Sequence, residues 1–240
     1  MSASPWREIG RVTRVSRYPL KGTQGEDLDR ARIGWHGLAG DRQYALLRHG
    51  DQSGLPREFP ALVAWRVTMP QPGHLHIKLP DGTSWEMAPD DARTRRQISE
   101  RASADLGEPV SLVQLWRGTF DSMPISVISA ATVTALAAEP AFDPRRLRAN
   151  LTIELDDPRP GVEQEWLRRD LRLGDGPDGA VLRIDRTTTR CEAVDVDPET
   201  GSRDREIFEQ VRRDRKNRIG VYASVRHPGT VSAGAAVFLR

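Results

Sequence analysis

Residues 185 to 201 read DRTTTRCEAVDVDPETG, and the rest of the chain is organised around this stretch. Its Cys191 is the only cysteine in 240 residues, so it cannot form an internal disulfide. The nearby Arg186 and Arg190 favour the thiolate, because a positive charge stabilises the ionised sulfur that attacks electrophiles or binds metals. The alternative is a buried, inert cysteine in a core strand. Such a strand should be apolar on at least one face, and these threonines and arginines are polar.

Size and composition limit the classes of protein to which this chain can belong. Lysine and arginine total 36 against 34 acidic residues, which gives a net charge of only +2. A single cysteine excludes Cys-rich zinc sites and the thiolate sets that hold iron-sulfur clusters. The opening MSASPWREIG lacks the apolar core of a signal peptide, and no run approaches the ~20 apolar residues of a membrane helix. We therefore expect a globular, cytoplasmic protein with no membrane partner.

The first third of the chain predicts strands that place two basic residues at polar ends. Residues 9–21, IGRVTRVSRYPLK, are rich in β-branched residues and predict a strand that ends before Lys21. Residues 37–47 predict a loop with Arg42 followed by a second strand. Alternating apolar residues between 63 and 87 predict a hairpin or meander. Its His74 and His76 share one strand face, but no third ligand is near, so we expect a solvated face and not a metal site.

The remaining segments predict short strands and surface helices. Residues 90–107 have helical spacing and end at Gly107, and a strand follows through 110–115. FDSMPISVIS, residues 120–129, predicts a polar loop, a strand, and a cap from Ser129 for a helix over 130–138. The arginine-rich DPRRLRAN, residues 143–150, is either an anion site or solvated surface. Residues 181–184 predict a strand, 203–213 an amphipathic helix, and 221–239 closing strands.

Five segments in order resemble the MOSC family, named after the C-terminal domain of molybdenum cofactor sulfurase. They span residues 18–46 with YPLKG and GLAGDRQYAL, then 121–129, 145–153, 189–201 and 220–239. The resemblance implies an α+β, β-rich fold: a MOSC-type β-barrel with peripheral helices, forming one unit over residues 1–240. Within it we expect an N-terminal β-barrel segment of about 1–115 and a MOSC core with Cys191 of about 116–240.

The resemblance also implies roles for individual residues. Cys191 corresponds to a molybdenum ligand, and Asp121 to an acid beside the substrate, so both are expected to be catalytic. The residues expected to hold the molybdenum-molybdopterin cofactor are Lys21, Arg42, Ser122, Ser129, Arg148, Asn150 and Arg190. The sequence departs from the family at Gly22, where animal members carry serine. It departs again in AGAAV, residues 233–237, which lacks the usual Gly-Asp.

Two enzyme classes follow from these residues. The resemblance implies a molybdenum-dependent oxidoreductase that reduces N-hydroxylated or N-oxygenated small molecules, with the Cys191 thiolate on the metal. The chain has no G-x-G-x-x-G or similar flavin motif and too few cysteines for a cluster, so its electrons are expected from a separate flavin or iron-sulfur protein. The alternative is a sulfurtransferase that carries a Cys191 persulfide, with a pyridoxal phosphate-dependent partner.

A third function, nucleic-acid binding, rests on the basic stretch RRDRKNR at residues 212–218. Acidic residues are mixed with basic ones throughout the chain, and aromatic residues make up only 6% of it. Neither a continuous basic face nor a base-stacking platform is evident from such a pattern. We therefore predict a solvated helix end there, and no nucleic-acid partner.

Overall fold

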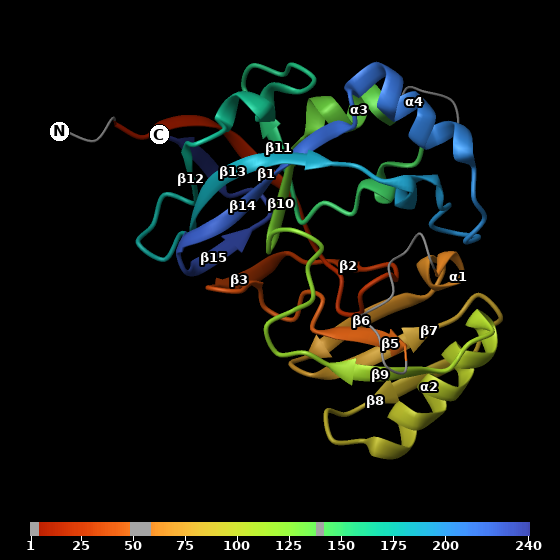
Figure 1. Ribbon diagram of the computed structural model, residues 1–240. Helices are drawn as coiled ribbons and strands as arrows, with labels where there is room; N and C mark the ends of the chain where they lie inside the picture. The colour runs from red at the N-terminus through yellow and green to blue at the C-terminus, as the bar shows by residue number, and fades with distance from the viewer. Residues whose placement is uncertain (1–4, 49–58, 138–141) are drawn as a thin grey trace.

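A closed β-barrel dominates the computed structural model, which describes residues 5–48, 59–137 and 142–240 (Figure 1). Within the described residues, seven strands close the barrel. In order around it they are β11 (Leu151–Leu155), β10 (Ile125–Ser129), β14 (Arg218–His227), β13 (Val181–Thr189), β12 (Asp170–Leu173), β16 (Ala236–Leu239) and β1 (Arg7–Arg17). β10 and β11 are parallel, and the other pairs are antiparallel. The predicted β-rich α+β fold with a barrel is confirmed.

The barrel is closed by β1, the first strand of the chain. Val12 and Val15 of β1 point into the apolar core, which the strands from both ends of the sequence fill. Gly10 lies where β1 crosses β11, and a Cβ atom there would sit 2.0 Å from the carbonyl oxygen of Glu154. The close approach of the two backbones therefore requires a glycine. The barrel therefore combines β1, from the expected N-terminal segment of about 1–115, with six strands from the expected MOSC core of about 116–240.

A second lobe follows β1 in sequence and packs below the barrel in Figure 1. Its strands and helices are β5 (Tyr44–Arg48), β9 (Val110–Gln114), β6 (Arg66–Gln71), β7 (His74–Lys78), β8 (Ser84–Met87), α1 (Pro60–Val63) and α2 (Ala92–Leu106). β6, β7 and β8 form the predicted meander. Asp91 caps α2 by accepting a hydrogen bond from the Thr94 amide at 2.9 Å, and Gly107 ends the helix in the left-handed conformation.

Smaller elements connect the lobe and the barrel and cover the barrel's side. The strands are β2 (Glu26–Asp27), β3 (Arg30–Gly34), β4 (Gly37–Leu38) and β15 (Gly229–Ser232), and the helices are α3 (Ala130–Ala137), η1 (Pro144–Leu147), η2 (Val162–Trp166), η3 (Glu192–Asp195) and α4 (Arg205–Arg215). α3, η1, η3 and α4 share a small apolar core. The helices predicted over 130–138 and 203–213 are confirmed as α3 and α4, and Ala138 lies outside the described residues.

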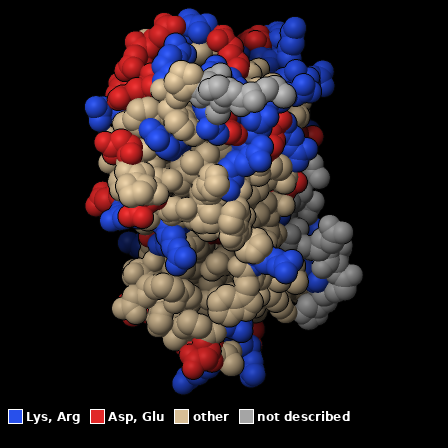
Figure 2. All heavy atoms as spheres, turned by 90° about the vertical axis from the view of Figure 1, so that its left-hand side faces the viewer, with Lys and Arg blue, Asp and Glu red and all other residues tan. Residues whose placement is uncertain are grey.

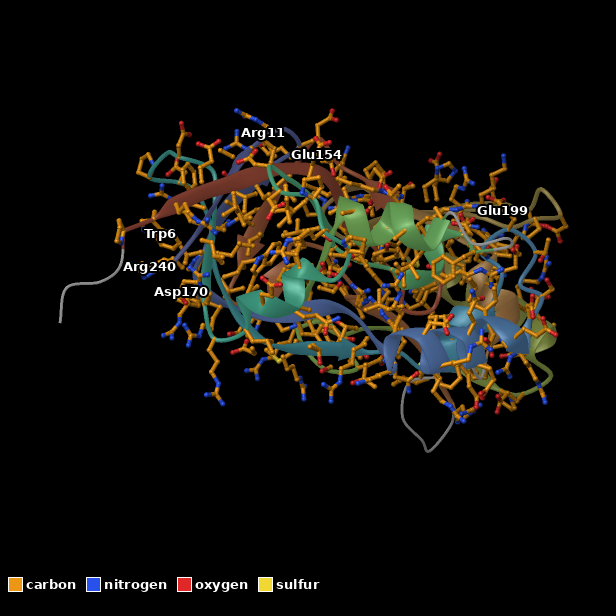
Figure 3. All side chains as sticks on the ribbon, turned by 90° about the horizontal axis from the view of Figure 1, so that it is seen from above. Trp6, Arg11, Glu154, Asp170, Glu199 and Arg240 are labelled. Carbon is orange, nitrogen blue, oxygen red and sulfur yellow. The ribbon has the colours of Figure 1, made fainter. Side chains whose placement is uncertain are left out.

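The surface and the two ends of the molecule differ in charge and packing. Figure 2 shows acidic and basic residues crowded over the upper part of one face and a broad area with few charges below it. Trp6, Asp170 and Arg240 lie together at one end in Figure 3, with Glu199 at the other. At the end that carries Trp6, the guanidinium of Arg240 lies 4.5 Å from the Trp6 ring centroid and donates to Asp170 at 3.1 Å. The first and last strands are therefore tied together.

Candidate active site

A cavity of about 410 Å³ opens where the barrel meets the second lobe. Segments 21–22, 120–126, 146–150 and 186–194, together with Arg42 and Tyr222, line it. Eight of the nine residues predicted for the site are among them: Lys21, Arg42, Asp121, Ser122, Arg148, Asn150, Arg190 and Cys191. Sequence positions as far apart as 21 and 191 are thus brought to one concave surface. Its volume lies in the usual range of about 300–1,000 Å³ for ligand sites.

Cys191 follows the end of β13 and is exposed to the cavity, so the alternative of a buried, inert cysteine is wrong. The strand continues through the threonines to Thr189, farther than the predicted 181–184, because Thr187 and Thr189 pair with β14. Side chains alternate along this strand: Thr187 and Thr189 line the cavity, and Thr188 is buried on the other side. The strand is polar because one of its faces is a cavity wall.

Arg190 fixes the end of this strand. Its guanidinium donates to the carbonyl of Ile219 at 3.0 and 2.7 Å and to the carbonyl of Leu147 at 2.6 Å. Burial lowers the pKa of Arg190 from its ordinary value, and nearby Tyr222 and Cys191 oppose that change. Arg190 therefore ties β13, β14 and the arginine-rich turn together behind the cysteine, in addition to lining the cavity.

Two more arginines enclose the ring of Tyr18. The guanidinium carbons of Arg42 and Arg148 lie 4.7 and 4.5 Å from the ring centroid. Both residues adopt positive φ, 50° each, which is uncommon outside glycine, and Arg148 does so as the residue that ends η1. Burial is the largest single effect and opposes the charge of Arg42, but Asp41, Tyr18 and Asp121 together outweigh it, so the pKa of Arg42 is raised.

Arg148 is a partly buried arginine without a salt-bridge partner among the described residues. Burial, and then repulsion from Arg42, lower the pKa of Arg148 to about 10. Its guanidinium donates to the backbone carbonyl of Thr23, and no carboxylate in the described part of the chain forms an ion pair with it. Asp41 and Asp121 offset the fall in its pKa only in part, so a bound anion would stabilise the charge further.

Asn150 is buried and its side-chain amide is satisfied within the protein. The amide donates to Asp41 at 3.1 Å and to the Ser16 carbonyl at 3.2 Å. Its oxygen accepts from the amide and hydroxyl of Ser126, at 3.1 and 3.0 Å. Asn150 thus lines the cavity mainly as the residue that holds Asp41, which in turn pairs with Arg42.

Lys21 and Arg186 hold the loop that carries Asp121. The Lys21 ammonium is buried and lies 2.7 Å from the Asp121 carboxylate, whose side chain is 56% exposed. Lys21 also donates to the Thr119 hydroxyl at 3.3 Å. Next along the loop, Ser122 accepts a hydrogen bond from Arg186. Two consecutive loop residues are therefore held by side chains from distant parts of the chain.

Ser129 is the predicted site residue that the structure places elsewhere. It is fully buried at the start of α3, where its hydroxyl accepts from the Thr132 amide at 3.2 Å and shares a hydrogen bond with the Thr132 hydroxyl. It does not line the cavity, because the last residue of β10 lies beyond the loop that faces the cysteine. Its helix-capping role, predicted from the sequence, is confirmed.

Sequence reasoning missed several side chains that line the cavity, among them Arg146, Arg186 and Tyr222. Arg146 is buried, pairs with Asp197 at 3.0 Å, and has an Nε without a hydrogen-bond partner in the described residues. The arginine run at 145–148 was a signal for Arg146. Strict alternation would place Arg186 on the same face as Thr188, and it reaches the cavity because the register of β13 shifts near it, which the sequence does not show. Tyr222 has no such signal, because β14 reads as an apolar closing strand.

Two further expectations concern metals and membranes. His74 is partly exposed and His76 exposed on β7, as expected for a solvated strand face. Across the described ranges, no three His, Cys, Asp or Glu side chains lie close enough together to hold a metal ion. None of the helices in those ranges combines the length and apolar character needed to cross a membrane.

Comparison with known families agrees with the resemblance seen in the sequence. The MOSC domain model matches residues 115–238, and the MOSC N-terminal beta barrel domain model matches residues 9–107. The chain belongs to the MOSC family. No curated protein matches its sequence.

Several solved structures resemble the chain at low sequence identity. The YuaD protein from Bacillus subtilis is 13% identical, with 98% of both chains covered and a TM-score of 0.46. YiiM from Geobacillus stearothermophilus is 13% identical over 49% of this chain and 54% of its own, with a TM-score of 0.36. YiiM from Escherichia coli is 17% identical over 51% and 57%, with a TM-score of 0.37.

Proposed function

We propose that this MOSC protein is a molybdenum-cofactor-dependent oxidoreductase that reduces N-hydroxylated or N-oxygenated compounds. The observation that carries the proposal is the position of Cys191: the only sulfur nucleophile of the chain opens into a cavity lined by Lys21 and five arginines. MOSC family members include enzymes that bind a molybdenum cofactor. Electrons come from a separate protein, since the chain has neither a flavin motif nor cysteines for a cluster.

The residues that line the cavity fit a molybdopterin cofactor. Cys191 offers a soft thiolate, the ligand type that suits a metal already held by dithiolene sulfurs. The charge of Arg148 and the unpartnered Nε of Arg146 suit the cofactor's phosphate, through charge-assisted hydrogen bonds. Arg42 adds positive charge beside Arg148, and Lys21 lines the same cavity. When bound, the cofactor supplies the two-electron chemistry.

The chain's own groups bind the substrate and move protons. Reduction of an N-hydroxyl group follows R–NH–OH + 2 e⁻ + 2 H⁺ → R–NH₂ + H₂O, so a proton must reach the leaving oxygen. Asp121 is exposed to the cavity and paired with the Lys21 ammonium, which makes this pair the proton relay in our proposal. Phe120 and Met123 beside it provide apolar contacts for the rest of the substrate.

The test is turnover of benzamidoxime with chemically reduced methyl viologen, on protein whose molybdenum content has been measured. We expect molybdenum near one atom per chain and formation of benzamidine. Asp121→Asn should retain molybdenum and lose about 100-fold in kcat, the usual scale of proton-transfer catalysis. Asp175→Asn, on an exposed loop, is the matched control and should keep full activity. Molybdenum-loaded protein that leaves benzamidoxime unreduced would contradict the proposal.

A sulfurtransferase is the second candidate, because Cys191 is exposed and accessible to a protein that delivers sulfur. In that case a Cys191 persulfide would be loaded by a pyridoxal phosphate-dependent partner. Cyanide treatment of the purified protein separates the two candidates. Cyanide-releasable sulfur in metal-free protein, lost in Cys191→Ala, supports the carrier and contradicts the reductase.

A further inference from the structure

Two exposed tryptophans flank a second concave surface on the lobe side of the cavity. The side chain of Trp35 is 65% exposed and that of Trp116 is 74% exposed, the highest values among large apolar residues in the described ranges. Trp35 lies in the turn between β3 and β4, and Trp116 follows β9. Both line a hollow of about 230 Å³. Tryptophans left in water at one place commonly mark a protein interface.

The charge around this hollow is positive. Arg32 and Arg117 are exposed at its rim, and neither has a carboxylate partner among the residues that the structure describes. The acidic residue in its lining, Asp41, is 1% exposed and paired with Arg42. Tryptophan and arginine are the residues that contribute most to binding at interfaces.

This surface is the outer side of the active-site wall. Asp41 lines the hollow and Arg42 lines the Cys191 cavity, so consecutive residues face opposite sides. Likewise, Gly118 lines the hollow and Phe120 lines the Cys191 cavity. Thr119 between them donates its amide to the Arg42 carbonyl at 2.9 Å and accepts from Lys21 at 3.3 Å. A protein bound at the tryptophans would therefore lie one backbone layer from the cavity.

We propose that the surface formed by Trp35, Trp116, Arg32 and Arg117 is the docking site of the electron donor, a small redox protein with an acidic face. The inference rests on the proposed function. The positive charge of this surface predicts a negatively charged face on the partner, because unpaired arginines attract carboxylates and repel basic carriers. Each turnover takes two electrons, which a one-electron carrier delivers in two short encounters, and small interfaces suit such encounters.

The test uses an acidic [2Fe–2S] ferredoxin, kept reduced by its NADPH-dependent reductase, as the probe. We expect binding that weakens as salt rises, and Arg32→Glu/Arg117→Glu to lower kcat/KM for ferredoxin at least tenfold. Trp35→Ala/Trp116→Ala should weaken ferredoxin binding at every salt concentration. Both double variants should reduce benzamidoxime at the wild-type rate with methyl viologen. Arg93→Glu/Arg96→Glu, on exposed positions of α2, is the matched charge reversal and should leave ferredoxin kinetics unchanged.

The two proposals fail in different ways. A molybdenum-loaded wild type that is inactive with methyl viologen overturns the proposed function. Wild type that is active with methyl viologen, but whose ferredoxin kinetics respond equally to the β3 and α2 charge reversals, overturns the docking site alone. Absence of salt-sensitive binding to both acidic ferredoxin and acidic flavodoxin also overturns it.

Discussion

Replacing Arg148 by glutamine tests whether this arginine serves ligand binding or the stability of the fold. Burial and Arg42 lower the Arg148 pKa from 12.5 to about 10. At about 1.4 kcal/mol per pKa, the charge destabilises the folded chain by about 3 kcal/mol. Glutamine relieves this, but removes the charged hydrogen bond to Thr23, worth about 2 kcal/mol, and the contact with Tyr18, worth about 1 kcal/mol. The effects cancel, so we expect unchanged stability within about 1 kcal/mol.

Arg146→Gln is the matched comparison, since Arg146 lines the same cavity but is paired. It is 7% exposed, donates to the Val194 carbonyl at 3.1 Å and pairs with Asp197 at 3.0 Å. Removing Arg146 takes away its ion pair with the partly exposed Asp197 and its hydrogen bond to Val194, and hydrogen bonds from charged groups are worth about 1.5–3 kcal/mol each, so we expect a loss of about 3 kcal/mol. Urea unfolding of cofactor-free protein measures both variants. If Arg148→Gln lost as much free energy of unfolding as Arg146→Gln, our account of Arg148 as an only partly compensated charge would be refuted.

Two further predictions concern the fold around the site. Gly10→Ala should lower the free energy of unfolding by about 3 kcal/mol, because its Cβ would lie 2.0 Å from the Glu154 carbonyl oxygen. Urea unfolding measures this loss. Gly176→Ala is the control and should show little change, because nothing lies within 4 Å of the added Cβ. Burial raises the pKa of Asp195 above its ordinary 3.8. Because the folded state then holds that proton more tightly than the unfolded state, this group's contribution to stability falls as pH rises above about 4. The stability of Asp195→Asn relative to wild type should therefore be higher at pH 7 than at pH 3.5 in urea titrations, and a pH-independent difference would contradict this.

The fold and most of the site were predictable because their signals are local. Alternating apolar residues predicted β6, β7 and β8, and the family motifs brought Lys21, Arg148 and Cys191 to one cavity. A polar strand was harder to predict, since the threonines before Cys191 look like a loop until β14 is seen to pair with them. Its polarity reflects the cavity on one side of the barrel wall, which is a tertiary feature.

Other features depend on contacts that sequence spacing does not encode. The saturated hydrogen bonds of Asn150 arise from Ser16, Asp41 and Ser126, which are far apart in the chain. Ser129 shares a motif with the cavity loop, yet the strand between them carries it to the helix α3. A sequence also does not show which tryptophans are exposed, because tryptophan is usually well buried.

X-ray absorption at the molybdenum edge tests the central claim most directly, since it counts the sulfur ligands of the metal. Wild-type protein and Cys191→Ser, both loaded with cofactor, are to be compared. We predict one fewer sulfur ligand in Cys191→Ser, with the cofactor still held by the arginines and Lys21. An identical sulfur count in the two proteins, or wild-type protein free of molybdenum when made in cells that supply the cofactor, would contradict the account.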